Sequence, residues 1–313
     1  MEKILITGAF GQIGTELFIA LQKKYGDDSV VALAHEHVPK GFIGISEKGD
    51  VREKETLKNI IVKHNITQIY HLASLLSAVG ENKPQLAWDV NIEGLKNVLD
   101  LAAEFKLKIF WPSSIAVFGP TTPRENTPQN TACEPTTMYG VTKVSGELLC
   151  QYYYIKYGVD VRSVRFPGLI SYKVAPGGGT TDYAVAIFYG ALEGQKYTCF
   201  VNEKTILPMM YMDDAIKSII MIMNVDADKI KIRTSYNLTA ISFSAKDLEK
   251  EIQKIIPELI VEYKPDERQR IADSWPKVID DSEARKDWGW NHDFGITKMT
   301  EVMLENLKKK LGK

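Results

Sequence analysis

The glycine-rich segment GAFGQIG at residues 8–14 constrains the fold more than any other feature of the sequence. It directly follows a short apolar run, KILIT at residues 3–7, and leads into apolar residues at helical spacing. Gly8 permits a tight turn, Gly11 lets the backbone approach a pyrophosphate, and Gly14 lets helix and strand pack closely. The first N–H groups of such a helix also attract phosphate. The segment therefore predicts a strand–turn–helix unit that binds a dinucleotide.

Strand and helix patterns alternate through the rest of the first half. Short apolar runs predict further strands at 30–34, 66–74, 108–114 and 159–168. Helical spacing predicts helices at 53–64, 84–105 and 138–157. Alternation of this kind is typical of parallel strands joined by right-handed crossovers. The predicted fold is α/β, a doubly wound parallel Rossmann sheet.

The alternation ends near residue 170. A glycine-rich loop at 171–183 is followed by a helix to about Leu192, a strand pair around 196–208, and a helix from Asp213. A strand at 233–239, a helix capped by Ser244 and a final helix at 294–311 complete the prediction. We expect the Rossmann domain to comprise 1–170 and 209–240. A smaller, threaded C-terminal substrate lobe would comprise 171–208 and 241–313.

Composition excludes several classes of function. Basic and acidic side chains number 39 and 40, a balance that argues against a nucleic-acid partner and against docking on an anionic membrane. The three cysteines and five histidines lack the paired spacing of a metal site, so no metal is expected. The sequence enters a strand pattern at once and contains no apolar run long enough to span a bilayer. We therefore expect a cytoplasmic protein.

Tyr139 and Lys143 are the candidate catalytic pair. Their spacing places the phenol and the ammonium on one face of the predicted helix at 138–157. A lysine cation and a positively charged nicotinamide ring would stabilise the phenolate and lower the pKa of the tyrosine, which could then accept a hydroxyl proton. Ser113 and Ser114 end the preceding predicted strand and could hydrogen-bond the reacting oxygen.

These motifs together resemble the extended branch of the short-chain dehydrogenase/reductase superfamily, which includes sugar-nucleotide epimerases and dehydratases. The resemblance rests on the glycine loop, HLAS (71–74), NIEG (91–94), PSSIAVFG (112–119) and YGVTK (139–143). The second half is similar to the short-chain type of L-threonine 3-dehydrogenase. That likeness is carried by PGLISYKVAPGGGTTDYAV (167–185), LPMMYMDDA (207–215), RIADSWPKVIDDS (270–282) and ARKDWGW (284–290).

The resemblance implies an activity and a set of site residues. It implies NAD-dependent oxidation of the β-hydroxyl of L-threonine to 2-amino-3-ketobutyrate by a homodimer, with Tyr139 as base assisted by Lys143 and Ser114, and with Ser113 beside them. The implied cofactor contacts are Gly8, Gly11, Gln12, Ile13, Gly14, Asp50, Val51, Leu72, Ala73, Tyr139, Lys143 and Leu169. The implied substrate contacts are Ser77, Ser114, Tyr139, Gly179, Thr180, Thr181 and Trp275. The glycines and threonines of the 177–181 loop could also turn several donors onto one substrate carboxylate.

One position departs from the family pattern. Ala34 stands at the end of the second predicted strand, where an acidic residue usually binds the ribose of NAD. Glu36 is the nearby acid, and no arginine follows that would hold the 2′-phosphate of NADP. NAD is therefore the favoured cofactor. Two alternatives stay open, a sugar-nucleotide epimerase or dehydratase and a non-catalytic NAD-binding protein.

Overall fold

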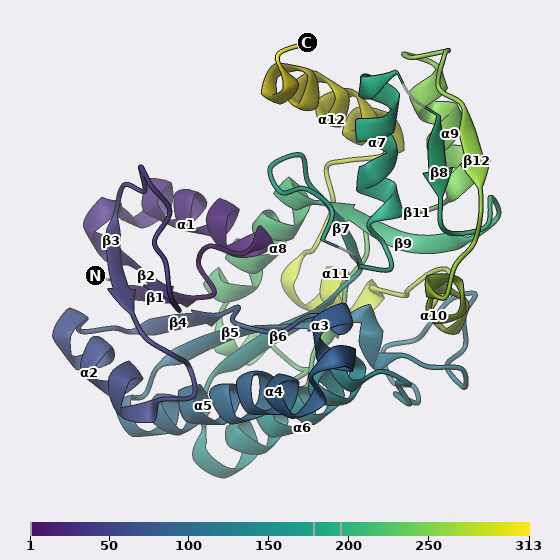
Figure 1. Cartoon of the computed structure of the whole chain (residues 1–313). Helices are drawn as coiled ribbons and strands as arrows, with labels where there is room; N and C mark the ends of the chain where they lie inside the picture. Colours follow the sequence, from purple (N-terminus) through teal and green to yellow (C-terminus); the bar gives the residue numbers. More distant parts are fainter. Residues whose placement is uncertain (1, 178, 195) are drawn as a thin grey trace. The chain divides into compact units, whose positions relative to one another are not determined.

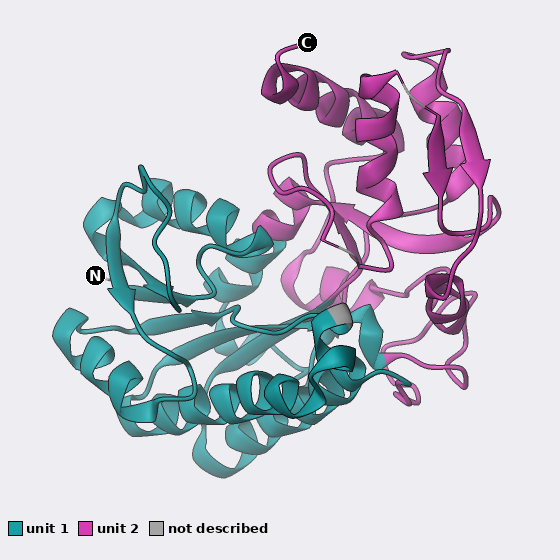
Figure 2. Cartoon of the chain, in the orientation of Figure 1, with its two compact units in different colours: residues 1–117, 136–165, 218–236 teal, residues 118–135, 166–217, 237–313 magenta. Residues whose placement is uncertain are grey.

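The computed structural model describes residues 2–177, 179–194 and 196–313. Contacts divide the chain into two compact units, coloured separately in Figure 2. Unit 1 contains residues 1–117, 136–165 and 218–236, and unit 2 contains residues 118–135, 166–217 and 237–313.

Unit 2 includes residues 118–135, which the sequence had suggested as part of the Rossmann domain. The reason lies in their partners. Thr127 forms a β-bridge with Ile279, and the Arg124 carbonyl accepts a 2.8 Å hydrogen bond from the Lys277 amide. Both partners belong to the C-terminal part of the chain, so this segment folds with unit 2.

A seven-stranded sheet carries unit 1. Its strands are β1 (Ile4–Thr7), β2 (Val30–Ala34), β3 (Ile45–Lys48), β4 (Gln68–His71), β5 (Lys108–Ser114), β6 (Val161–Phe166) and β10 (Tyr236–Asn237). Their order is β10-β6-β5-β4-β1-β2-β3, and β1 lies parallel to both β2 and β4. The strand order reverses between β1 and β4, which makes the carboxyl ends of these two strands the expected ligand crevice of a doubly wound sheet.

Helices cover the sheet of unit 1. Figure 1 shows α2 (Lys54–His64), α5 (Gly94–Phe105) and α6 (Met138–Tyr157) below the strands, with α1 (Gln12–Tyr25) above them. Buried aliphatic side chains of α2, α5 and the strands form one continuous core. The helix expected at 84–105 consists of α4 (Pro84–Trp88), a π-helical turn at Asp89–Glu93, and α5. The predicted bounds of α6 are confirmed.

Unit 2 contains two small sheets. Strands β11 (Ile241–Ser244), β9 (Ile206–Tyr211) and β7 (Gly168–Ile170) form the first, in that order. Strands β8 (Tyr197–Cys199) and β12 (Val261–Tyr263) form the second and run parallel. The predicted strand pair around 196–208 is therefore wrong, because β8 and β9 each pair with strands distant in sequence.

The helices of unit 2 surround these sheets. They are α7 (Tyr183–Glu193), α9 (Ala245–Gln253), α10 (Arg268–Ser274), α11 (Ser282–Trp288) and α12 (Ile296–Leu311), while α8 (Met212–Asn224) continues from unit 2 into unit 1. Ser244 caps α9 as predicted, in a reciprocal capping box with Asp247.

Candidate active site

The glycine loop joins β1 to α1 and has the geometry of a phosphate cradle. Gly8 has a φ of +67°, and a side chain there would bring its Cβ within 2.7 Å of the Ala73 amide nitrogen. A Cβ at Gly14 would lie 2.3 Å from the Gly8 carbonyl oxygen. Helix α1 begins at Gln12 with no side-chain cap and no acidic residue in its first turn. Its first amides are therefore suited to an anion, and the loop fits a dinucleotide pyrophosphate.

Hydrogen bonds join the carboxyl ends of β1 and β4 beside this loop. The Thr7 hydroxyl lies 2.8 Å from Nδ1 of His71 and accepts a 3.2 Å hydrogen bond from the Ala73 amide. The Leu72 amide donates to the Thr7 carbonyl at 3.1 Å. Burial lowers the pKa of His71 to about 3, so its ring is neutral at physiological pH. Leu72 and Ala73 are therefore held at the point where the strand order reverses.

On the adenosine side of the expected cofactor site, the carboxylate follows β3 and does not stand at the end of β2. Ala34 is buried at the end of β2 and provides no charge. Asp50 follows β3, and its bond from Arg52 lowers its pKa to about 2, so it is ionised. Nε2 of His35 lies 3.2 Å from the Asp50 carboxylate. Glu36 is exposed and lies near the two flanking histidine rings, His35 and His37, on the surface.

Val51, the other adenosine-side residue expected from the sequence, lies in the core. A Cβ at Gly94, the first residue of α5, would come within 2.8 Å of a Val51 methyl group. Val51 itself therefore packs closely against the start of α5.

Helix α6 presents the candidate catalytic pair from its first two turns. Thr137 caps the helix by accepting a 3.1 Å hydrogen bond from the Gly140 amide. The buried Lys143 ammonium donates a 2.7 Å hydrogen bond to the Pro112 carbonyl and lies 5.4 Å from the centre of the Tyr139 ring. The sequence spacing thus produces a tyrosine and a lysine on one face, directed at the end of β5.

The pKa values in this pair differ from the expectation. Desolvation raises the pKa of Tyr139 to about 12, and a hydrogen bond with Ser114 opposes the rise. Desolvation also lowers the pKa of Lys143 to about 7, which leaves the ammonium partly deprotonated at neutral pH. In the free chain, burial therefore outweighs the expected effect of Lys143 on Tyr139.

Ser113 and Ser114 have different partners. Ser114 hydrogen-bonds the Tyr139 phenol, and it is the serine that stands beside the candidate base. The buried Ser113 hydroxyl donates a 2.6 Å hydrogen bond to the Glu147 carboxylate instead. The structure therefore brings Ser114, Tyr139 and Lys143 together and directs Ser113 away from them.

Ser77 begins the short helix α3 (Ser77–Asn82), which packs against the start of α6. Glu81 of α3 accepts a 2.6 Å hydrogen bond from the Met138 amide, and a Cβ at Gly80 would lie 3.8 Å from the Tyr139 amide nitrogen. The helix that carries Ser77 is thus fixed beside the residues that carry Tyr139.

The remaining predicted substrate and cofactor residues belong to unit 2. Gly178 lies outside the described residues. The amides of Gly177 and Gly179 both donate to the Asp182 carboxylate, at 2.7 and 2.8 Å. We expected these two amides to face a substrate carboxylate. In the structure their partner is the side chain of Asp182.

The other unit 2 residues of the predicted site are buried or half-buried. Thr180 is buried, and Thr181 packs so closely on Gly168 that a Cβ there would lie 2.8 Å from its methyl group. Leu169 lies in β7. Trp275 is buried, and its carbonyl accepts a 2.9 Å hydrogen bond from Nε of Arg124.

Two residues that support this site, Asn91 and Glu147, have no role in the sequence-based prediction. Asn91 lies in the π-helical turn, where its side chain hydrogen-bonds Ser74, both backbone polar groups of Leu75, and Thr142. Glu147 lies one turn after Lys143 and pairs with the buried Arg165. The asparagine of the NIEG string and a glutamate four residues after Lys143 were the available signals.

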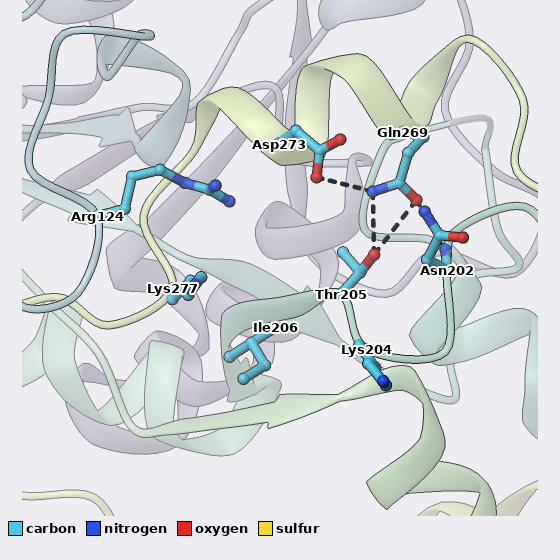
Figure 3. Close-up of a pocket in the computed structure, with 8 residues that line it drawn as sticks. All are labelled: Arg124, Asn202, Lys204, Thr205, Ile206, Gln269, Asp273 and Lys277. Atoms are coloured by element: carbon cyan, nitrogen blue, oxygen red, sulfur yellow. Dashed lines mark hydrogen bonds between the residues drawn. The ribbon is translucent and has the colours of Figure 1, made fainter.

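Surface depressions occur in both units. One, of about 370 Å³, is lined by Pro84, Gln85, Trp88 and Met138 of unit 1. Figure 3 shows the other, of about 180 Å³, in unit 2. It is lined by Arg124, Asn202, Lys204, Thr205, Ile206, Gln269, Asp273 and Lys277, and Gln269 joins Thr205 and Asp273 by hydrogen bonds.

Among the residues that the structure describes, no helix is both long and apolar enough to cross a membrane. Within the same residues, no group of histidine, cysteine and acidic side chains is arranged to hold a metal ion.

Comparison with known proteins identifies the family. The model of the NAD dependent epimerase/dehydratase family matches residues 4–238. The chain belongs to this family. An uncharacterised epimerase/dehydratase of Staphylococcus haemolyticus is 50% identical to it over 99% of both chains.

Two solved structures of the NAD dependent epimerase/dehydratase fold are also similar. L-threonine dehydrogenase from Clostridium difficile is 51% identical, with a TM-score of 0.96 over 99% of this chain and 98% of that one. A monomeric L-threonine 3-dehydrogenase from a metagenome is 52% identical, with a TM-score of 0.95 over 98% of this chain and 99% of the other.

Proposed function

We propose that this chain is an NAD-dependent L-threonine 3-dehydrogenase that oxidises the β-hydroxyl of threonine to give 2-amino-3-ketobutyrate. The observation that carries the proposal is the grouping of Ser114, Tyr139 and Lys143 at the end of β5, in a unit that also holds the glycine loop. We infer the substrate from two solved relatives that are named as threonine dehydrogenases.

Tyr139 is the proposed base. In its phenolate form Tyr139 takes the β-hydroxyl proton as hydride leaves the carbon that bears this hydroxyl, while Ser114 hydrogen-bonds the same oxygen. The Lys143 cation stabilises the phenolate, and its bond to the Pro112 carbonyl fixes its position. NAD, when bound, supplies the hydride acceptor.

The cofactor-binding residues proposed from the sequence fit this role. Gly8, Gly11, Gln12, Ile13 and Gly14 would hold the pyrophosphate on the first amides of α1. Asp50 and Val51 would line the adenosine side, Leu72 and Ala73 the crevice between β1 and β4, and Leu169 the nicotinamide amide.

Substrate would be bound by residues of both sequence halves. Ser77 and Ser114 are proposed to contact threonine beside Tyr139 in unit 1. The substrate contacts proposed in unit 2 are Gly179, Thr180, Thr181 and Trp275. We further propose a cytoplasmic location and a role in threonine catabolism.

The test is NADH formation by the purified protein with threonine and NAD. Tyr139→Phe should reduce kcat by about a hundredfold or more, in the range usual for loss of a general base. Tyr197→Phe, which removes a half-buried phenol in unit 2, is the matched control and should retain turnover. Turnover of a UDP-sugar without threonine oxidation would instead identify an epimerase.

The proposed homodimer would use the exposed face of α6. Val141, Leu148, Tyr152 and Ile155 recur at helical spacing and are all exposed, Ile155 by 73%. Light scattering of the purified protein, with Leu148→Glu and Ile155→Glu as variants, tests this assembly. A monomer at micromolar concentration would refute it, and one relative is indeed described as monomeric.

A further inference from the structure

A buried ion pair joins α6, the helix that carries Tyr139 and Lys143, to strand β6. Nε and Nη2 of Arg165 donate to Oε1 and Oε2 of Glu147 at 2.8 and 2.7 Å. Both side chains are almost completely buried, with exposures of 5–6%. A buried pair of this kind is costly to desolvate and adds little net stability, so its presence calls for a reason beyond stability.

The same carboxylate also holds the end of β5. Oε1 of Glu147 accepts a 2.6 Å hydrogen bond from the buried Ser113 hydroxyl. Ser113 stands between Pro112, whose carbonyl accepts from Lys143, and Ser114, which bonds the Tyr139 phenol. Fixing Ser113 therefore fixes both neighbouring contacts of the proposed catalytic pair.

The negative charge of Glu147 also acts on the Lys143 ammonium. The ammonium faces the rings of Trp111 and Tyr139, and the titratable groups coupled to it are Glu147, Cys150 and His71. Burial raises the pKa of the Cys150 thiol well above its usual range and lowers that of His71 to about 3, so both are neutral at physiological pH. Cys150 and Glu147 both oppose the effect of burial on the pKa of Lys143. Because the Cys150 thiol is neutral, Glu147, one helical turn after Lys143, is the anion among these groups that opposes its deprotonation.

We propose that Glu147 is a positioning residue of the active site. Its carboxylate, which is held by Arg165, fixes the Ser113 hydroxyl and favours the protonated form of Lys143. Its effect on Lys143 is a property of the free chain, whereas its consequence for catalysis rests on the proposed function. Ser113 thereby acts through Glu147 and the strand end and does not contact substrate.

The direct test is a titration of Lys143 by NMR in the full-length protein labelled with ¹³C at lysine Cε. The resonance is assigned with Lys143→Arg. In the unsubstituted protein it should titrate with a midpoint near 7. In Glu147→Gln the midpoint should fall by about one pH unit or more, a tenfold loss of proton affinity, because the opposing charge is removed.

Two further variants separate charge from structure. Glu147→Asp keeps the charge and should titrate closer to the unsubstituted protein than Glu147→Gln does. Glu249→Gln removes another buried glutamate, in unit 2, and should leave the midpoint in place. If Glu147→Gln leaves Arg165 unpaired and fails to fold, Glu147→Gln/Arg165→Gln replaces both charges. The midpoint should still fall, but by less than in Glu147→Gln, because a cation is lost together with the anion.

A folded Glu147→Gln protein with an unchanged Lys143 midpoint would overturn the proposal, and so would an equal shift in Glu249→Gln. With threonine and NAD, Glu147→Gln should also reduce kcat at neutral pH about tenfold while changing KM little. Absence of threonine turnover in the unsubstituted protein would contradict the proposed function but would leave the NMR titration valid. The two failures are therefore distinguishable.

Discussion

Ser113 and Ser114 are adjacent at the end of β5, yet Ser114 bonds the Tyr139 phenol whereas Ser113 donates to Glu147. Successive side chains of a strand point to opposite faces, which separates the two hydroxyls. The sequence alone could not tell which serine stands beside the candidate base. Their hydrogen-bond partners show that it is Ser114.

The two serine variants should therefore behave differently. Because the Ser114 bond lowers the pKa of Tyr139, Ser114→Ala should raise the apparent pKa of the rising limb of the kcat–pH profile and lower kcat about tenfold or more. Ser113→Ala should mainly lower the free energy of unfolding, by about 1–3 kcal/mol, since it leaves a buried acceptor short of a donor. Equal pH profiles for both variants would contradict this assignment.

Asp182 is expected to control substrate affinity. Its carboxylate holds the amides of Gly177 and Gly179, so Asp182→Ala should release the loop and raise KM for threonine about tenfold, with kcat much less affected. Asp182→Asn retains an acceptor oxygen and serves as the matched control, with a smaller rise. Steady-state kinetics at saturating NAD measure both. A fall in KM for Asp182→Ala would mean that the carboxylate competes with substrate.

Ala34 offers a test of cofactor selection. Ala34→Asp would add the carboxylate usual for ribose recognition and repel a 2′-phosphate. We expect it to increase the preference for NADH over NADPH about tenfold in fluorescence titrations, consistent with the strength of a charged hydrogen bond. Ala34→Asn has the same shape without the charge and should change the preference little. If both variants behave alike, charge at this position does not set the preference.

His71 should make the fold sensitive to acid. Its folded-state pKa is about 3, below the ordinary value of 6.5, so the unfolded chain binds a proton more readily between these values. Its contribution to stability is complete above pH 6.5 and is lost as the pH falls toward 3, with a slope of up to about 1.4 kcal/mol per pH unit.

Chemical denaturation at a series of pH values checks this. His71→Gln should show a flatter decline in the free energy of unfolding below pH 6.5. His37→Gln, at a highly exposed histidine, should follow the unsubstituted protein. Parallel curves for all three proteins would exclude His71 as the source of acid sensitivity.

Much of unit 1 was predictable because its signals are local. The strands at 30–34 and 108–114 and the helix at 138–157 match the structure to the residue. Each is an apolar run or periodic segment with a clear boundary, such as Thr137 before α6 and Gly158 after it. The positive φ of Gly8 likewise agrees with the tight turn expected there.

Long-range partners were not predictable in the same way. Strand β8 pairs with β12, more than sixty residues later, and neither strand has a strong pattern of its own. The Glu147–Arg165 pair joins α6 to β6, and the spacing of YGVTK says nothing of β6. Burial, which raises the pKa of Tyr139 to about 12, likewise emerges only once the chain is folded.

Unit 1 cannot complete its sheet until late in synthesis, because its last segment follows much of unit 2 in the chain. Unit 1 needs residues 218–236, and β10, next to β6 in the sheet, ends at Asn237. Until Tyr236 and Asn237 have been synthesised, β6 is therefore an unpaired edge with free backbone donors and acceptors. Nascent chains stalled before residue 236 should be more prone to aggregation and more dependent on chaperones than the released protein.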